Sequence, residues 1–258
     1  MRRLMNVRWF TSALVIVVLS VACLQLGRWQ LHRLDSRKAH NEVIRKNLAA
    51  PVTPLTEIVG PDRVIGEQHD WRTATVTGRY DATKQVVVRY RNVNDRPGFE
   101  IVTPLLLPDG TAVLVDRGFL PKQGGELAPG TVPAAPSGEV TVTGRLRRSE
   151  RGGHTNGGTP ADGTARLING AEYAPALGLT LYDGYLTVDQ QEPAADPAFR
   201  GFPGPEIDGG PHFFYALQWF LFGLLAIGGL VYFSRQDVTA EEPATVAGNN
   251  DDVARTTP

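Results

Sequence analysis

Two long apolar runs lie near the ends of the 258-residue chain, and each is long enough to cross a lipid bilayer. Residues 9–26 contain no charged side chain, and neither do residues 213–233. A helix over the second run is about 31 Å long, close to the ~30 Å hydrocarbon core of a bilayer. The pattern predicts two transmembrane helices, at residues 9–27 and 212–233.

The first apolar run also has features of a cleaved signal peptide, because arginines precede it and Ser20-Val21-Ala22 resembles a small-x-small cleavage site. A lipoprotein site at Cys23 is a weaker alternative. A helical pattern continues past this cysteine through residues 26–49, which favours a retained membrane anchor over cleavage.

The segment between the predicted helices, residues 28–211, is expected to form the main folded domain. Long loops cross a membrane largely regardless of charge, whereas the short basic N-terminus, residues 1–8, should stay in the cytoplasm. We therefore expect a multi-pass protein of the cell membrane whose large domain is extracytoplasmic. Residues 234–258 lack apolar periodicity, which predicts a disordered cytoplasmic tail.

Short β-like runs separated by glycine and proline fill the central segment. Residues 99–107 and 111–118 flank Asp109-Gly110, a turn pair that predicts a β-hairpin. The pattern predicts an α+β fold, with two terminal transmembrane helices flanking a mainly antiparallel β domain that is either a barrel or a sandwich. Further strands are expected at residues 71–80, 84–91, 138–148 and 185–190, and a short helix within residues 169–178.

The pentapeptide TVTGR occurs twice, at residues 75–79 and 141–145. Each copy reads as a strand that reaches a glycine and then continues. Glycine inside a strand marks a bulge or a sharp bend, so the repeat predicts two strands of one curled sheet.

Charge and motif content exclude several classes of function. Lys and Arg number 26 against 27 Asp and Glu, so the chain has no basic footprint for nucleic acid. The single cysteine rules out an intrachain disulfide or a CxxC site. The sequence lacks an HExxH motif, a Walker loop, a GxGxxG after a strand and a GxSxG elbow, which predicts a protein that is not an enzyme. A membrane-tethered hydrolase or sensor is a minor alternative, and the Gly-rich loop at residues 152–163 around His154 is expected to be a flexible surface loop.

Three segments in order resemble the Surfeit locus protein 1 family. They are LGRWQLHRLDSRK from Leu26, PGFEIVTPLLLPDGTAVLVDRGFLP at residues 97–121, and HFFYALQWFLFG from His212. The chain departs from the usual family pattern at Phe119, where tryptophan is common, and at Asp116, where asparagine is common. The resemblance implies a role in assembling cytochrome c oxidase. It also implies haem a as a transient cofactor, with the oxidase catalytic subunit, other respiratory-complex subunits and the lipid bilayer as partners.

His212 stands at the start of the second apolar run, at the expected depth of the headgroups. A neutral imidazole is tolerated there and could ligate haem iron. At 100° per residue, Tyr215 and Trp219 share a helix face with His212, whereas Gln218 is rotated by about 120°. An aromatic belt with a histidine at the helix start explains the same pattern without any cofactor.

Trp29, Gln30 and Arg33 close the first helix and should face the same region if the two helices pack together. Interfacial anchoring explains them equally well, and His32 is a remote candidate for a second axial ligand. Arg117 follows a strand, where a local ion pair or turn hydrogen bond is the simplest role, and holding a carboxylate of haem or of the oxidase is the functional one. The candidate haem a contacts are His212, Tyr215, Trp219, Trp29, Arg33 and Arg117, with His212 as the iron ligand. The alternative function is a structural subunit of a respiratory complex that binds no haem.

Overall fold

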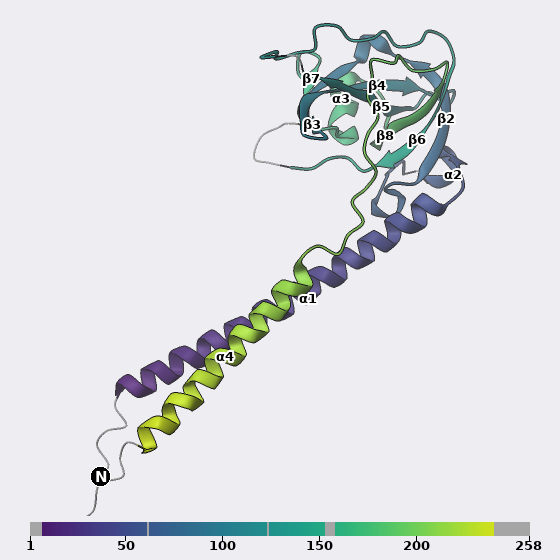
Figure 1. The fold of residues 1–258 in the computed structure, drawn as a ribbon. Coiled ribbons are helices and arrows are strands. Elements are labelled where there is room, and N and C mark those ends of the chain that lie inside the picture. Colours follow the sequence, from purple (N-terminus) through teal and green to yellow (C-terminus); the bar gives the residue numbers. More distant parts are fainter. Residues whose placement is uncertain (1–6, 61, 123, 153–157, 240–258) are drawn as a thin grey trace, which may run out of the picture. The chain divides into compact units, whose positions relative to one another are not determined.

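The computed structural model describes residues 7–60, 62–122, 124–152 and 158–239, which fall into two compact units. One unit takes the chain up to Lys38 and from Gly209 onward, and it consists of helices. The other takes residues 39–208 and contains the sheet (Figure 1). His154 and the predicted tail from residue 240 lie outside the described residues.

Helices α1 (Val7–Ala49) and α4 (His212–Thr239) contain the two apolar runs. Each contains an 18-residue window apolar enough to cross a membrane, with a mean hydropathy of 2.2 in α1 and 1.8 in α4. α1 continues beyond the predicted anchor at residues 9–27, because no proline follows until Pro51 and the residue before a proline disfavours the helical conformation. α4 likewise continues past residue 233 to Thr239, so the tail begins as helix.

Five strands of the second unit close into a ring. Their hydrogen-bonded order is β2-β6-β8-β5-β4, and a short ladder between β4 and β2 completes the circle. Most neighbours are antiparallel, whereas β5 and β8 run parallel. Of the two predicted forms, barrel and sandwich, the structure has the barrel, which leaves no open edge within the ring. The ring strands are β2 (Thr73–Tyr80), β4 (Arg96–Leu106), β5 (Ala112–Pro121), β6 (Val140–Arg147) and β8 (Leu181–Glu192).

The remaining elements extend or cover the ring. β3 (Val86–Val93) pairs with β4, β7 (Thr164–Ala165) pairs with β3, and β1 (Thr53–Pro54) pairs with β2. α3 (Gly170–Leu177) confirms the predicted short helix. The Asn169 side chain caps its start by accepting a hydrogen bond from the Glu172 backbone N–H. The short helix α2 (Leu55–Ile58) and the 3-10 turns Glu67–His69 and Ala82–Lys84 lie in the connections.

The two TVTGR copies pair with each other, antiparallel, as the neighbouring strands β2 and β6. Both glycines allow an adjacent backbone to come close. A Cβ atom on Gly78 would lie 2.3 Å from the carbonyl oxygen of Leu106, and one on Gly144 would lie 2.1 Å from that of Thr187. The ladder between β6 and β8 shifts register at Gly144, which confirms the predicted bulge there. At Gly78 the strand approaches β4, where the ring closes.

Strand β5 is buried on both faces and separates two apolar clusters. Val113 and Val115 belong to one cluster, while Leu114 belongs to the other, because successive strand residues point to opposite sides. The second cluster contains Tyr173, which α3 packs against the sheet. This double burial explains why the polar residues that follow in β5 are also enclosed by protein.

Candidate functional site

His212 lies against the middle of α1, within the helix unit. Its imidazole Nδ1 is 2.9 Å from the side-chain oxygen of Gln30. An amide oxygen can only accept a hydrogen bond, so Nδ1 is the donor in this contact, and in the neutral imidazole Nε2 then carries the lone pair. Histidines that bind metals are commonly held in this way, with the second ring nitrogen donating to an oxygen.

Small residues line the contact between α1 and α4, which run side by side within this unit (Figure 1). Ala216 is buried, and a Cβ on Gly27 would lie 2.4 Å from the ring of Phe220. Gly223 faces Cys23, whose Cβ would lie 3.4 Å from an added methyl group. Small residues permit close helix packing in membranes, and the two helices pack together here.

The other predicted residues of this unit differ in how exposed they are. Trp219 is half-buried and packs edge to face on Phe222, with ring centroids 6.0 Å apart. Tyr215 and Trp29 are about half-exposed, and Arg33 is exposed. The structure therefore brings His212 and Gln30 into direct contact and leaves the aromatic side chains around them accessible.

Arg37 is a neighbour of His212 that the sequence analysis did not single out. Gly210 adopts a positive φ of 62°, and a Cβ there would lie 3.6 Å from Nε2 of His212 and 3.7 Å from the guanidinium carbon of Arg37. Arg37 follows Gln30 by seven residues, so the two share a helix face. That spacing is the signal that could have identified it.

Arg117 belongs to the barrel unit, and its side chain is bound within that unit. It donates to the side-chain oxygen of Gln85 at 3.1 Å and to the carbonyl oxygen of Ala134 at 2.7 Å. Its guanidinium also lies over the rings of Phe199 and Tyr80, at 4.9 and 5.6 Å. The role of Arg117 as a haem contact stays a prediction, and such a contact would have to replace some of these partners.

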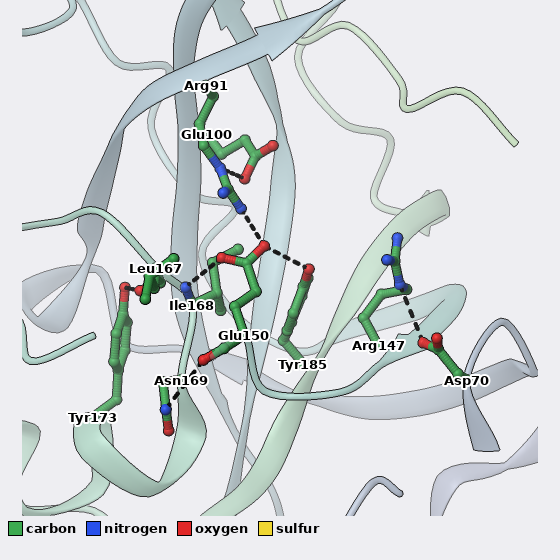
Figure 2. Close-up of polar contacts among 10 residues, drawn as sticks. All are labelled: Asp70, Arg91, Glu100, Arg147, Glu150, Leu167, Ile168, Asn169, Tyr173 and Tyr185. Atoms are coloured by element: carbon green, nitrogen blue, oxygen red, sulfur yellow. Dashed lines mark hydrogen bonds and ion pairs between the residues drawn. The ribbon is translucent and has the colours of Figure 1, made fainter. Parts of the chain in front are cut away.

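A buried polar network, here called the Arg91 cluster and formed by Arg91, Glu100, Glu150 and Tyr185, lies in the barrel unit (Figure 2). Arg91 donates to both carboxylates, and its distance to Glu150 is 2.6 Å. Glu150 also accepts from the hydroxyl of Tyr185 at 3.2 Å and from the backbone N–H of Ile168 at 2.9 Å. The two carboxylates raise the pKa of Arg91 despite its burial, so it stays charged.

The Arg91 cluster forms a wall shared by two cavities, of about 620 and 240 Å³. Arg147 lines both cavities and donates to Asp70 at 3.2 Å (Figure 2). No short motif could reveal this cluster, because its members come from β3, β4, β8 and the segment after β6, and Arg91 and Glu150 are 59 positions apart.

Asp116 lines the smaller cavity and is only 1% exposed. Its carboxylate accepts a 3.3 Å hydrogen bond from the backbone N–H of Gly118. A local hydrogen bond is therefore present, but the predicted end of the strand at Asp116-Arg117-Gly118 is wrong, because β5 continues to Pro121 in its ladder with β4. Burial, followed by the nearby charge of Glu100, raises the pKa of Asp116 well above its ordinary value of 3.8.

In the Asp116→Asn variant, the free energy of unfolding is expected to fall less than in the wild type as pH rises. The folded protein holds the Asp116 proton more tightly than the unfolded chain, so the free energy of unfolding falls as pH rises above 3.8 toward the raised pKa. Asparagine removes that contribution, about 1.4 kcal/mol for each unit by which the pKa is raised. Urea unfolding of both proteins from about pH 4 to about pH 8 measures the difference. If the free energies of unfolding of the two proteins changed with pH in the same way, the folded protein would not hold a proton on Asp116 more tightly than the unfolded chain.

The sequence is similar to one known protein family and to several known proteins. A family model described as the SURF1 family matches residues 17–224, which is most of the chain. The chain belongs to the SURF1 family. An uncharacterized SURF1-like protein of Mycobacterium bovis is 34% identical over 236 residues, covering 90% of this chain and 85% of that protein. Surfeit locus protein 1 of Xenopus tropicalis is 26% identical over 153 residues, covering 53% of this chain and 48% of its own length. A SURF1-like protein of Rickettsia felis is 26% identical over 108 residues, covering 41% and 45%.

Membership of the SURF1 family confirms the resemblance found in the sequence. The family is known for cytochrome oxidase assembly. The matched span includes Gln30 in α1, the Arg91 cluster in the barrel and His212 in α4. Residues of both units therefore fall within the part of the chain that defines the SURF1 family.

Proposed function

We propose that this protein is an assembly factor or accessory subunit of an a-type cytochrome c oxidase. Membership of the SURF1 family supports this function, since the family is known for cytochrome oxidase assembly. In this proposal α1 and α4 anchor the chain in the cell membrane and the barrel unit lies outside the cytoplasm. The apolarity of both helices supports the anchoring.

The contact between His212 and Gln30 carries the finer part of the proposal, which is that the helix pair receives haem a on its way to the catalytic subunit. With the ring proton held at Nδ1 by Gln30, Nε2 of His212 is the atom suited to ligate iron. Haem a, when bound, would supply a redox-active iron.

The neighbouring side chains suit the rest of such a ligand. Tyr215, Trp219 and Trp29 offer accessible aromatic surface for a macrocycle. Arg33 is exposed in the described structure and can pair with a carboxylate. These residues fit haem a in chemistry, and their role is to bind and orient it.

Visible spectra of the full-length protein, purified in mild detergent from cells that make haem a, test this proposal. Bound a-type haem is expected in the wild type and its loss in His212→Ala. Gln30→Leu should lower the affinity for haem about 10- to 100-fold, because partners that hold a ligating histidine typically contribute that much. His40→Ala serves as the control, since His40 is a histidine of α1 that belongs to the barrel unit and contacts Glu67, and this variant should keep its haem.

Different results separate the two candidate functions. A wild-type protein that co-purifies with the oxidase but carries no haem would favour a purely structural subunit. A deletion strain with normal a-type absorbance and normal oxidase activity would contradict both.

A further inference from the structure

Gln218 is an exposed amide near the start of the apolar part of α4, six residues after His212. It lies between Leu217 and Trp219 in the stretch His212–Arg235, which contains an 18-residue window of mean hydropathy 1.8. Among the residues that the structure describes, its side chain makes no hydrogen bond. The proposed function gives His212 a role, but it does not explain this glutamine.

The helix geometry turns Gln218 away from α1. His212, Ala216 and Gly223 face α1, as their contacts show. Gln218 is rotated by about 120° from His212 and lies about 9 Å farther along the helix axis. Neither Gln30 nor the small-residue contact with α1 can therefore satisfy its amide.

Gln218 belongs to a stripe that differs from the rest of the outer surface of α4. At spacings of three and four residues, this stripe, here called the Gln218 stripe, contains an amide, two large apolar side chains and a glycine. The outward face next to it consists of leucines at the same depth, Leu217, Leu221 and Leu224, which are all exposed. The Gln218 stripe is formed by Gln218, Phe222, Leu225 and Gly229.

The two outward faces suit different surroundings. A leucine face needs only lipid. An amide facing hydrocarbon loses the hydrogen bonds that water would give it, and a glutamine side chain is too short to reach the headgroups from about 9 Å below them. Polar residues in membrane helices accordingly face other helices, where they hydrogen-bond, and glycine allows the second helix to approach closely.

We propose that the Gln218 stripe docks against a transmembrane helix of the oxidase catalytic subunit that presents a hydrogen-bonding group at the depth of Gln218. This inference rests on the proposed function and names the surface of α4 that would contact the oxidase within the membrane. A partner of this chemistry satisfies the amide, which lipid cannot do. It also leaves the leucine face free for lipid and the His212 contact undisturbed.

Capture of the oxidase by tagged full-length protein in mild detergent tests the hydrogen bond. Gln218→Leu is expected to reduce the amount of co-purified catalytic subunit by about three- to tenfold, the effect of losing one interhelical hydrogen bond. Gln218→Asn, which keeps an amide, should restore much of the capture. Unchanged capture by Gln218→Leu would overturn the inference.

Site-specific photo-crosslinking tests the face. Photoreactive residues at positions 218, 222 and 225 should form adducts with the catalytic subunit, whereas those at 217, 221 and 224 should react with lipid. Adducts with the catalytic subunit from the leucine face, or adducts joining two copies of this chain through position 218, would overturn the inference while leaving the proposed function standing. A wild-type protein that captures no oxidase would contradict the proposed function itself, and with it this partner.

Discussion

Replacing Arg91 with methionine is expected to lower the free energy of unfolding by about 3–5 kcal/mol, the usual effect of removing one partner of a buried ion pair. The Arg91 side chain is only 17% exposed, and it is the cation that hydrogen-bonds to both Glu100 and Glu150. Without it, two largely buried carboxylates lose the cation that they share. Each must then either lose its charge or stay ionised without a partner, and both outcomes favour the unfolded chain.

Chemical denaturation of the full-length chain in detergent micelles measures this effect. Arg45→Met is the matched control, because Arg45 forms an exposed ion pair with Glu42 and should change stability by less than about 0.5 kcal/mol. Adding Glu100→Gln and Glu150→Gln to the Arg91 variant should recover part of the loss, since the unpaired charges are then gone. Equal effects of the Arg91 and Arg45 substitutions would show that the buried network contributes little to stability.

Gly144→Ala is expected to destabilise the barrel by about 3 kcal/mol, at the upper end of what overpacking typically costs. The added methyl group would lie 2.1 Å from the carbonyl oxygen of Thr187 and 2.9 Å from its carbonyl carbon. These are backbone atoms of β8, so a side-chain rotation cannot relieve the clash. The ladder itself would have to move, at the place where its register already shifts.

The same denaturation measurement tests Gly144, with Gly201→Ala as the control. A Cβ on Gly201 would meet nothing within 4 Å, so that variant should stay within about 0.5 kcal/mol of the wild type. A Gly144 variant as stable as the Gly201 variant would mean that β6 and β8 can separate at little cost.

Local patterns in the sequence were sufficient for most of the elements. The apolar runs indicated α1 and α4, and Asp109-Gly110 indicated the hairpin of β4 and β5, whose turn has Gly110 at φ 80°. The closure of the ring could not be predicted in this way, because the ladder between β2 and β4 contains only the pairs Arg79 with Leu106 and Tyr80 with Leu105. Pairings between distant segments depend on tertiary packing, which a single sequence does not display.

The residues of the candidate site could likewise be predicted only in part. His212 could be identified because a histidine at the mouth of an apolar helix is chemically unusual, and its contact with Gln30 follows from helix pairing. The Arg91 cluster could not, since charged residues scattered over a soluble segment look like surface residues until the fold buries them. The partners of Arg117 were equally hidden, because Gln85, Ala134 and Phe199 come from three separate connections.

The small-residue contact between α1 and α4 affects how firmly the register of the two helices is set. At this contact the ring of Phe220 lies against Gly27 and Gly223 lies against Cys23, so few side chains set the position of α4 along α1. A slip of one residue would turn α4 by about 100° and carry the imidazole away from Gln30. The hydrogen bond between His212 and Gln30 therefore helps to set the register of α4 against α1, whether or not a ligand is bound.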